Sequence, residues 1–200
     1  FDEFIINEAK RHLKQSELPL VCKKQIPKDA MPIYNFSGIL DLSIRASEGR
    51  ILARWNDSGW GREIAKGKIN KHFSDDLVVA AKDMIIERWK PNPFPTWITS
   101  VPSLNNVNLV KNFAKRLANL LNLQYLDSFE KIIKNDFQKK QENSFYQFKN
   151  LDGVFSINQV NPGPVFLVDD ITDSTATMTI LSALLLKKDV KLVYPLALAT

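Results

Sequence analysis

The stretch VFLVDDITDSTAT, residues 165–177, decides the fold of this chain. It begins with a continuous apolar run, Val165–Val168, which is typical of a β-strand covered on both faces. Two acidic residues, Asp169 and Asp170, follow this run, and a short polar turn then leads into a helix that we expect to begin near Met178. A buried strand followed by a turn and a helix is typical of α/β proteins.

Strands and helices alternate through most of the remaining chain. The apolar spacing and the positions of proline and glycine predict helices over about residues 1–14, 74–89, 107–121 and 178–188. They predict strands over residues 96–101, 123–127, 153–157, 165–168 and 192–199. This order indicates an α/β fold with a mainly parallel sheet and helices on both faces.

The first quarter of the chain has a different pattern. An amphipathic helix is expected at its start, and Pro27, Pro32 and Gly38 then interrupt a region with one or two short strands. We therefore divide the chain into an N-terminal extension or connector, residues 1–53, and an α/β domain, residues 54–200. Because the chain starts with phenylalanine rather than methionine, we expect it to be part of a longer protein.

Composition indicates a cytoplasmic protein that does not enter a membrane. The chain is 44% hydrophobic and 24% charged, and no apolar run approaches the roughly 20 residues that span a bilayer. The N-terminal segment is acidic where an export signal would be basic. A single cysteine, Cys22, can form no internal disulfide. The net charge of +5 permits a nucleic-acid partner, although the charge alone favours a solvated surface with a few extra lysines.

The polar turn after the acidic pair has the composition of a phosphate site. Free backbone N–H groups at the start of a helix attract phosphate, and hydroxyl side chains add further donors. The residues expected to bind phosphate are Asp173, Ser174, Thr175, Ala176 and Thr177. Asp169 and Asp170 could accept hydrogen bonds from ribose hydroxyls or hold Mg²⁺ through its waters. The expected ligand is therefore a ribose 5-phosphate with magnesium, and no metal ion bound by the protein alone.

A second loop lies at the end of another predicted strand. The sequence TSVPSLNN, residues 99–106, precedes a helix and should reach the same edge of the sheet. Its two serines and the intervening N–H groups could hold a diphosphate, although such loops are also common as simple connections. The residues of this expected diphosphate loop are Ser100, Val101, Pro102 and Ser103.

Two other interpretations of the acidic strand remain. The sequence VFLVDD also has the pattern of a Walker B strand, but the nearest P-loop candidate, GREIAKGKI at residues 61–69, has one residue too many and lacks the final Ser or Thr. The chain is therefore not expected to be an ATPase. The acids could also stand at a strand end without any ligand.

With both loops considered, the sequence resembles type I phosphoribosyltransferases of the ComF group. VFLVDDITDSTAT resembles their phosphoribosyl-diphosphate (PRPP) motif, and TSVPS resembles their diphosphate loop. The segments ILARWNDSGWGREIAKGK, ERWKPNPFPTWITSVPSL and QKKQENSFYQFKNLDG resemble the C-terminal region of a bacterial subset of RecQ-like DNA helicases. The resemblance implies a phosphoribosyltransferase-type fold and a helicase motor upstream of this chain.

The resemblance also implies a function. The domain would bind PRPP or a nucleotide phosphate with Mg²⁺, in a regulatory rather than a catalytic role, because Thr175 occupies the position of a family glycine. A β-branched residue with positive φ is strained, so we expect either a different turn shape or a reduced affinity. The alternatives are an active nucleobase phosphoribosyltransferase and a DNA-binding accessory domain. A mobile hood or a DNA-binding strip is expected at Gln138, Lys139 and Lys140.

Overall fold

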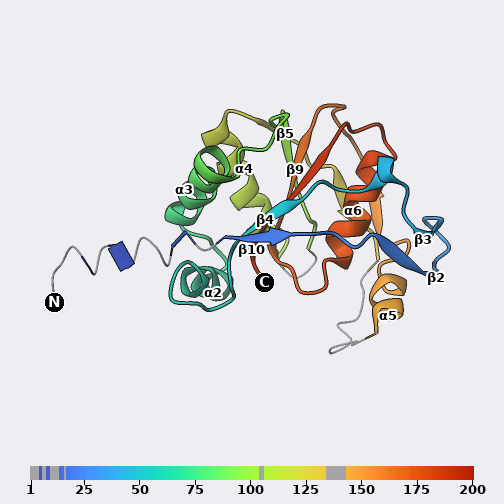
Figure 1. Cartoon of the computed structure of the whole chain (residues 1–200), viewed down its shortest axis with the longest axis horizontal. Coiled ribbons are helices and arrows are strands. Elements are labelled where there is room, and N and C mark those ends of the chain that lie inside the picture. The colour runs from blue at the N-terminus through green and yellow to red at the C-terminus, as the bar shows by residue number, and fades with distance from the viewer. Residues whose placement is uncertain (1–4, 6–7, 10–13, 16, 104–105, 134–142) are drawn as a thin grey trace.

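A six-stranded sheet forms the centre of the computed structural model (Figure 1). The structure describes residues 1–200 except 1–4, 6–7, 10–13, 16, 104–105 and 134–142. The strand order is β1-β4-β10-β9-β5-β6, and the strands other than β1 run parallel to one another. Their bounds are β1 Leu18–Leu20, β4 Gly49–Ala53, β5 Trp97–Ser100, β6 Gln124–Tyr125, β9 Val165–Ile171 and β10 Val193–Ala199. This confirms the prediction of an α/β fold with a mostly parallel sheet.

The two central strands are buried on both faces, as the apolar run predicted. Val165 and Leu167 of β9 pack into one hydrophobic cluster, and the alternating Phe166 and Val168 pack into another on the opposite face. Every residue of β10 is buried as well. Such burial fixes the register, because a shift by one residue would exchange the two faces.

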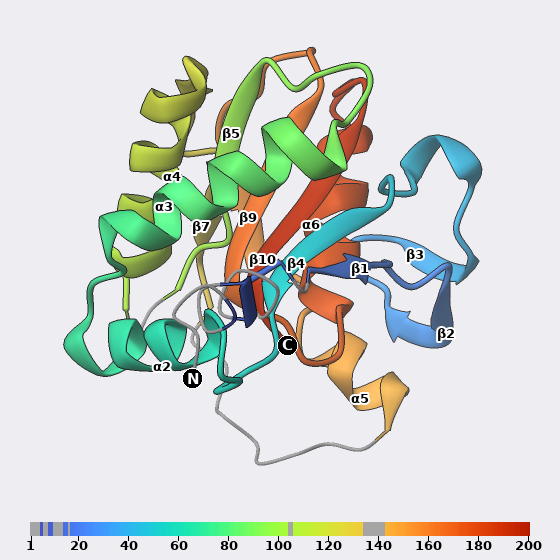
Figure 2. The same ribbon diagram turned by 60° about the vertical axis from the view of Figure 1, so that its left-hand side comes forward.

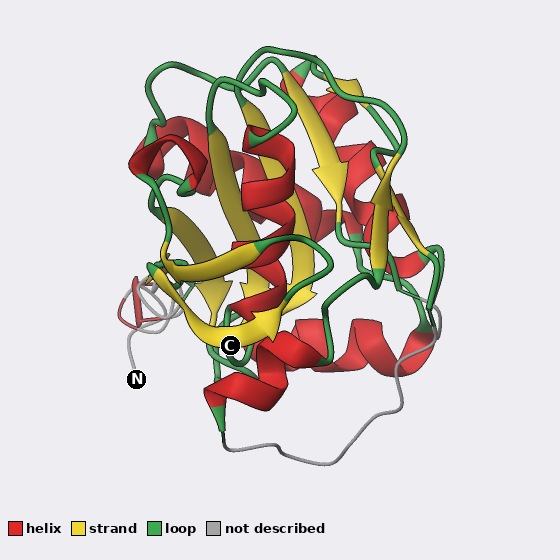
Figure 3. Cartoon of the chain, turned by 90° about the vertical axis from the view of Figure 1, so that its right-hand side faces the viewer, coloured by secondary structure: helices red, strands yellow, loops and turns green. Residues whose placement is uncertain are grey.

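Helices cover both faces of the sheet (Figures 1 and 3). One face is covered by α2 (Gly61–Asn70), α3 (Asp75–Asp83) with its π-helical continuation Met84–Trp89, and α4 (Leu109–Leu121). The other face is covered by α6, Ala176–Leu186, together with the β7–β8 ribbon. This ribbon pairs Phe129–Lys131 with Phe155–Ile157 in antiparallel orientation. The predicted strand at 153–157 is therefore present but lies outside the central sheet.

A small layer covers the outer side of α6. The antiparallel hairpin of β2 (Gln25–Met31) and β3 (Phe36–Ile39) packs with α5 (Ser144–Lys149) against the N-terminal half of α6. A short 3₁₀ turn, η1 (Leu42–Ile44), connects the hairpin to β4. The hairpin lies to the right of the sheet in Figure 1.

The segment predicted as an extension supplies two strands of the central sheet. β4 pairs in parallel with β10, and β1 pairs with β4 in antiparallel orientation. Residues on both sides of position 53 therefore contribute strands to the central sheet. Most residues of the helix predicted at 1–14 lie outside the described residues. Among the described residues, no helix has the length and apolar character required to cross a bilayer.

Candidate functional site at the carboxyl edge of the sheet

The strands β4, β5, β9 and β10 end at one edge of the sheet, which we call the carboxyl edge. β9 continues past the predicted Val168 to Ile171, so both acidic residues belong to the end of the strand. Asp169 lies opposite Ala197 of β10, and the N–H of Thr172 donates to the carbonyl of Ala199 at 2.9 Å. The C-terminus of the chain directly follows β10 at this same edge. Figure 2 shows α2 at the same end of the sheet, where α2 contacts β10.

Asp170 is held by an ion pair across the edge. Its Oδ2 accepts a hydrogen bond from Nζ of Lys68, on α2, at 2.6 Å, and its Oδ1 accepts one from the N–H of Ile171 at 2.7 Å. Asp170 is only 9% exposed. Both carboxylate oxygens therefore have partners within the protein, so this residue is better placed to fix α2 than to bind a ligand directly.

Asp169 has a different environment. Its side chain is half-buried, and its Oδ1 accepts a hydrogen bond from the N–H of Asp170 at 2.8 Å. Burial, and to a smaller extent the charge of Asp170, raise the pKa of Asp169 well above its usual range. A carboxyl group with a raised pKa favours any ligand that brings hydroxyl donors or a cation, because the ligand then stabilises its charged form. Of the two acids, Asp169 is the better candidate to contact a ligand.

The turn after β9 keeps the left-handed backbone conformation that glycine favours. Thr175 has φ 56° and ψ 2°, and α6 begins at the next residue, Ala176, two residues before the predicted start. The sequence predicted either a different turn shape or a reduced affinity for phosphate. The first of these expectations is therefore wrong. The threonine accepts a conformation that costs a β-branched residue on the order of 1–3 kcal/mol.

Thr179, one turn into α6, holds Thr175 in place. The carbonyl oxygen of Thr175 accepts hydrogen bonds from the backbone N–H of Thr179 at 2.9 Å and from its hydroxyl at 2.8 Å. Ser174 also supports the turn, since its Oγ accepts a hydrogen bond from the N–H of Ala176 at 3.4 Å. These hydrogen bonds stabilise the turn. The N-terminus of α6, which follows the turn, faces the carboxyl edge.

The predicted diphosphate loop starts beside β9. The N–H of Val101 donates to the carbonyl of Val168 at 2.8 Å, which places this loop next to the acidic strand end. The hydroxyl of Ser100 lies 2.9 Å from that of Tyr125, and burial raises the pKa of Tyr125 to about 12. The structure thus brings the loop and the acidic pair to one edge, as the sequence predicted.

A hollow of about 340 Å³ lies over this loop. It is lined by Ser100, Val101, Pro102, Ser103, Val107, Lys111, Asp127, Phe129, Glu130, Lys131 and Asn158. Lys111 forms an ion pair with Asp127, whereas burial lowers the pKa of Lys131. A partly desolvated lysine beside a serine loop favours an anion, because the anion restores its charged form.

Two residues of this edge were not identified from the sequence. Lys68 lies in the segment that does not fit a P-loop, and that segment forms α2. Tyr125 comes from β6, and nothing in its local sequence pattern connects it to the serine loop. The predicted strip Gln138, Lys139 and Lys140 lies outside the described residues. No family model and no curated protein matches this chain.

Proposed function

We propose that this chain binds a ribose-phosphate ligand, PRPP or a nucleotide, at the carboxyl edge of the sheet. The conformation of Thr175 is the observation that carries the proposal. A threonine in the left-handed region is costly, and here Thr179 holds it at the start of α6, six residues after Asp169 at the end of β9. Strain of this kind persists where the surrounding structure maintains it, and it is concentrated at functional sites.

The chemistry of such binding follows from the turn. The N–H groups of the residues that open α6 would donate to the phosphate, and the helix dipole would add a partial positive charge. Asp169 would accept hydrogen bonds from the ribose hydroxyls. Because the Cβ of Thr175 adds bulk where glycine would leave the backbone open, the phosphate would bind more weakly than on a glycine turn. This favours reversible sensing of the ligand over transfer of its ribosyl group.

Magnesium fits this arrangement as a companion of the ligand. Asp169 is half-buried at the end of β9, and a carboxylate can hold Mg²⁺ through its water shell. The ion would neutralise part of the diphosphate charge, while Lys131 and the serine loop would bind the diphosphate oxygens directly. The type I phosphoribosyltransferase fold and the RecQ-like parent helicase belong to this proposal, and they rest on the sequence resemblance.

The test is calorimetric titration of the chain with PRPP and MgCl₂. We expect Asp169→Asn combined with Asp170→Asn to weaken binding at least about tenfold, because both the ribose acceptor and the anchor of α2 are changed. Asp189→Asn is the matched control, since Asp189 is an exposed acid beyond the opposite end of α6. Equal affinity in the double variant, the control and the unchanged chain would refute the proposal.

A second candidate function, DNA binding by an accessory domain of the helicase, is favoured by α5. This helix follows the predicted lysine strip and exposes Tyr146, whose ring lies 5.4 Å from that of Phe145. Lys149 lies 5.8 Å from the Phe145 ring centroid. An exposed aromatic ring and a nearby lysine suit the stacking of bases and contacts with phosphates.

This candidate predicts salt-dependent binding of single-stranded DNA, measured by fluorescence anisotropy. Tyr146→Ala should weaken it by at least about fivefold through lost stacking. Lys139→Glu with Lys140→Glu should weaken it further and reduce its dependence on salt. Unchanged affinity in both variants would exclude this strip as the DNA contact.

A further inference from the structure

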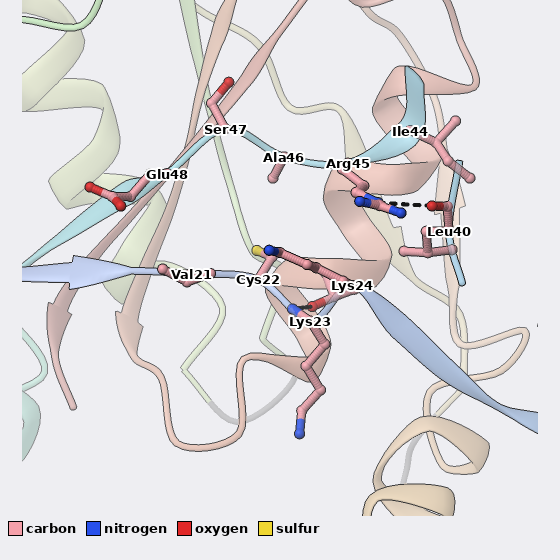
Figure 4. Close-up of a pocket in the computed structure, with 11 residues that line it drawn as sticks. Val21, Cys22, Lys23, Lys24, Leu40, Ile44, Arg45, Ala46, Ser47 and Glu48 are labelled. Atoms are coloured by element: carbon pink, nitrogen blue, oxygen red, sulfur yellow. Dashed lines mark hydrogen bonds between the residues drawn. The ribbon is translucent and has the colours of Figure 1, made fainter. Parts of the chain in front are cut away.

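A second pocket lies behind the turn, on the side of α6 that faces the β2–β3 hairpin (Figure 4). Its volume is about 210 Å³, which exceeds the roughly 150 Å³ that suffices for benzene. It is lined by Val21, Cys22, Lys23, Lys24, Leu40, Ile44, Arg45, Ala46, Ser47, Glu48 and Thr179. The pocket therefore has room for a small organic molecule.

Its charged lining is predominantly basic. Figure 4 shows the Arg45 guanidinium in the space between the two chain stretches, and the Lys24 side chain runs back toward Cys22. Nε of Arg45 donates to the carbonyl of Leu40 at 2.8 Å, which fixes the plane of the guanidinium. Neither Arg45 nor Lys24 forms an ion pair with a residue that the structure describes.

The acids near this pocket are already engaged. Glu48 points away from the space in Figure 4 and forms an ion pair with Arg50 at 2.5 Å. Hydrogen bonds from Ser43, and to a smaller extent the charge of Arg45, lower the pKa of Asp41. A pocket with two cationic heads and no acid directed into it favours an anionic ligand.

We propose that this pocket binds a small organic carboxylate with a short apolar chain. The fixed guanidinium fork matches the two oxygens of a carboxylate, and the Lys24 ammonium adds a second donor. Val21, Leu40 and Ile44 supply an apolar wall for the remainder of the molecule. The volume limits that molecule to a few carbon atoms, well below the size of a nucleotide.

The pocket is connected to the turn by two hydrogen bonds that share one hydroxyl. The N–H of Lys23 donates to Oγ1 of Thr179 at 2.9 Å, and this hydroxyl donates to the carbonyl of Thr175 at 2.8 Å. A ligand that orders the stretch from Val21 to Lys24 would thereby stabilise the left-handed turn. By linkage, a ligand at the turn would strengthen carboxylate binding by the same factor. This coupling rests on the proposed function, whereas binding in the pocket does not.

NMR titration of the ¹⁵N-labelled chain with sodium butyrate tests the binding. Saturable shifts are expected at the amides of Lys23, Lys24 and Arg45, with sodium chloride at equal ionic strength as the reference. Arg45→Gln and Lys24→Gln should each weaken binding at least about fivefold. Lys28→Gln, on the exposed part of β2, is the control and should leave binding unchanged. Absence of saturation by butyrate would overturn the proposal. A parallel titration in which inorganic phosphate saturates the shifts and butyrate does not would overturn it as well.

Two variants of Thr179 test the connection. Thr179→Ser keeps the hydroxyl, so butyrate should still shift the amides of Thr175 and Ala176. Thr179→Val removes it and should abolish these distant shifts while the shifts at Lys24 remain. Equal distant shifts in both variants would refute the connection. Because no phosphate ligand is present, these outcomes are readable even if PRPP fails to bind.

Discussion

Nζ of Lys68 lies 2.6 Å from Oδ2 of Asp170, so α2 is bonded directly to the acidic end of β9. The side chains are 30% and 13% exposed, which means that water screens this pair only in part. Removing the charge of one side chain would leave the other charge without a counterion at the carboxyl edge. The ion pair therefore contributes to the position of α2 beside the candidate site.

Lys68→Met should lower the free energy of unfolding by about 1–3 kcal/mol, because it leaves Asp170 without its counterion. Urea denaturation followed by circular dichroism measures the change. Lys66→Met is the matched control on the same helix, since Lys66 pairs with Glu63 in an exposed position and should cost less than about 0.5 kcal/mol. Equal losses in the two variants would contradict a structural role for the Lys68 pair.

Asp169→Asn should stabilise the protein increasingly as the pH rises from about 5 to 8. The raised pKa of Asp169 means that the folded chain holds a proton that the unfolded chain releases, so folding loses stability as the pH rises through this window. An asparagine does not titrate, and its Oδ1 can still accept from the N–H of Asp170. We expect a gain of about 2–6 °C in Tm at pH 8 and little gain at pH 5. A gain independent of pH would show that the pKa is not raised.

The sheet was predictable from sequence because its signals are local. The apolar run at 165–168 and the prolines before residue 96 define strands β9 and β5 without knowledge of their neighbours. The role of β4 was not predictable, because its place in the sheet depends on pairing with β10, more than 140 residues later. The same holds for the pairing of Lys68 with Asp170, whose residues are 102 positions apart.

Within the site, composition identified the acids and the turn but not their individual roles. Asp169 and Asp170 are adjacent and chemically identical, and the sequence offered no way to distinguish them. The structure distinguishes them through their partners, since Asp170 bonds to Lys68 whereas Asp169 carries the raised pKa. The positive φ of Thr175 was anticipated as one alternative, because glycine was expected there.

Thr175→Gly should raise the free energy of unfolding by about 1 kcal/mol or leave it unchanged. The substitution removes the cost of a β-branched residue with positive φ, and the greater entropy of glycine in the unfolded chain offsets part of that gain. Differential scanning calorimetry measures the outcome. Thr177→Gly is the control, since residue 177 lies within α6 and a helical glycine should destabilise by about 1 kcal/mol. A loss of stability in Thr175→Gly would show that the threonine side chain itself holds the turn.

Cys22 should react slowly with alkylating reagents. Burial raises the pKa of its thiol from 9.0 to about 11, although contacts with Thr179 and Ser182 oppose this. Two pKa units correspond to an approximately hundredfold smaller thiolate fraction at pH 8. Iodoacetamide labelling followed by mass spectrometry measures the rate, with the urea-unfolded chain as the reference. Labelling within about tenfold of that reference would contradict the buried environment.

The most direct test of a ribose-phosphate site is calorimetric titration with PRPP and MgCl₂, comparing the unchanged chain with Thr175→Gly. We predict that both bind and that the glycine variant binds at least about fivefold more tightly, because the phosphate can approach the open backbone. Binding should require Mg²⁺ in both cases. Failure of both proteins to bind PRPP would contradict the account, and the carboxyl edge would then be a structural feature stabilised by the Lys68–Asp170 pair.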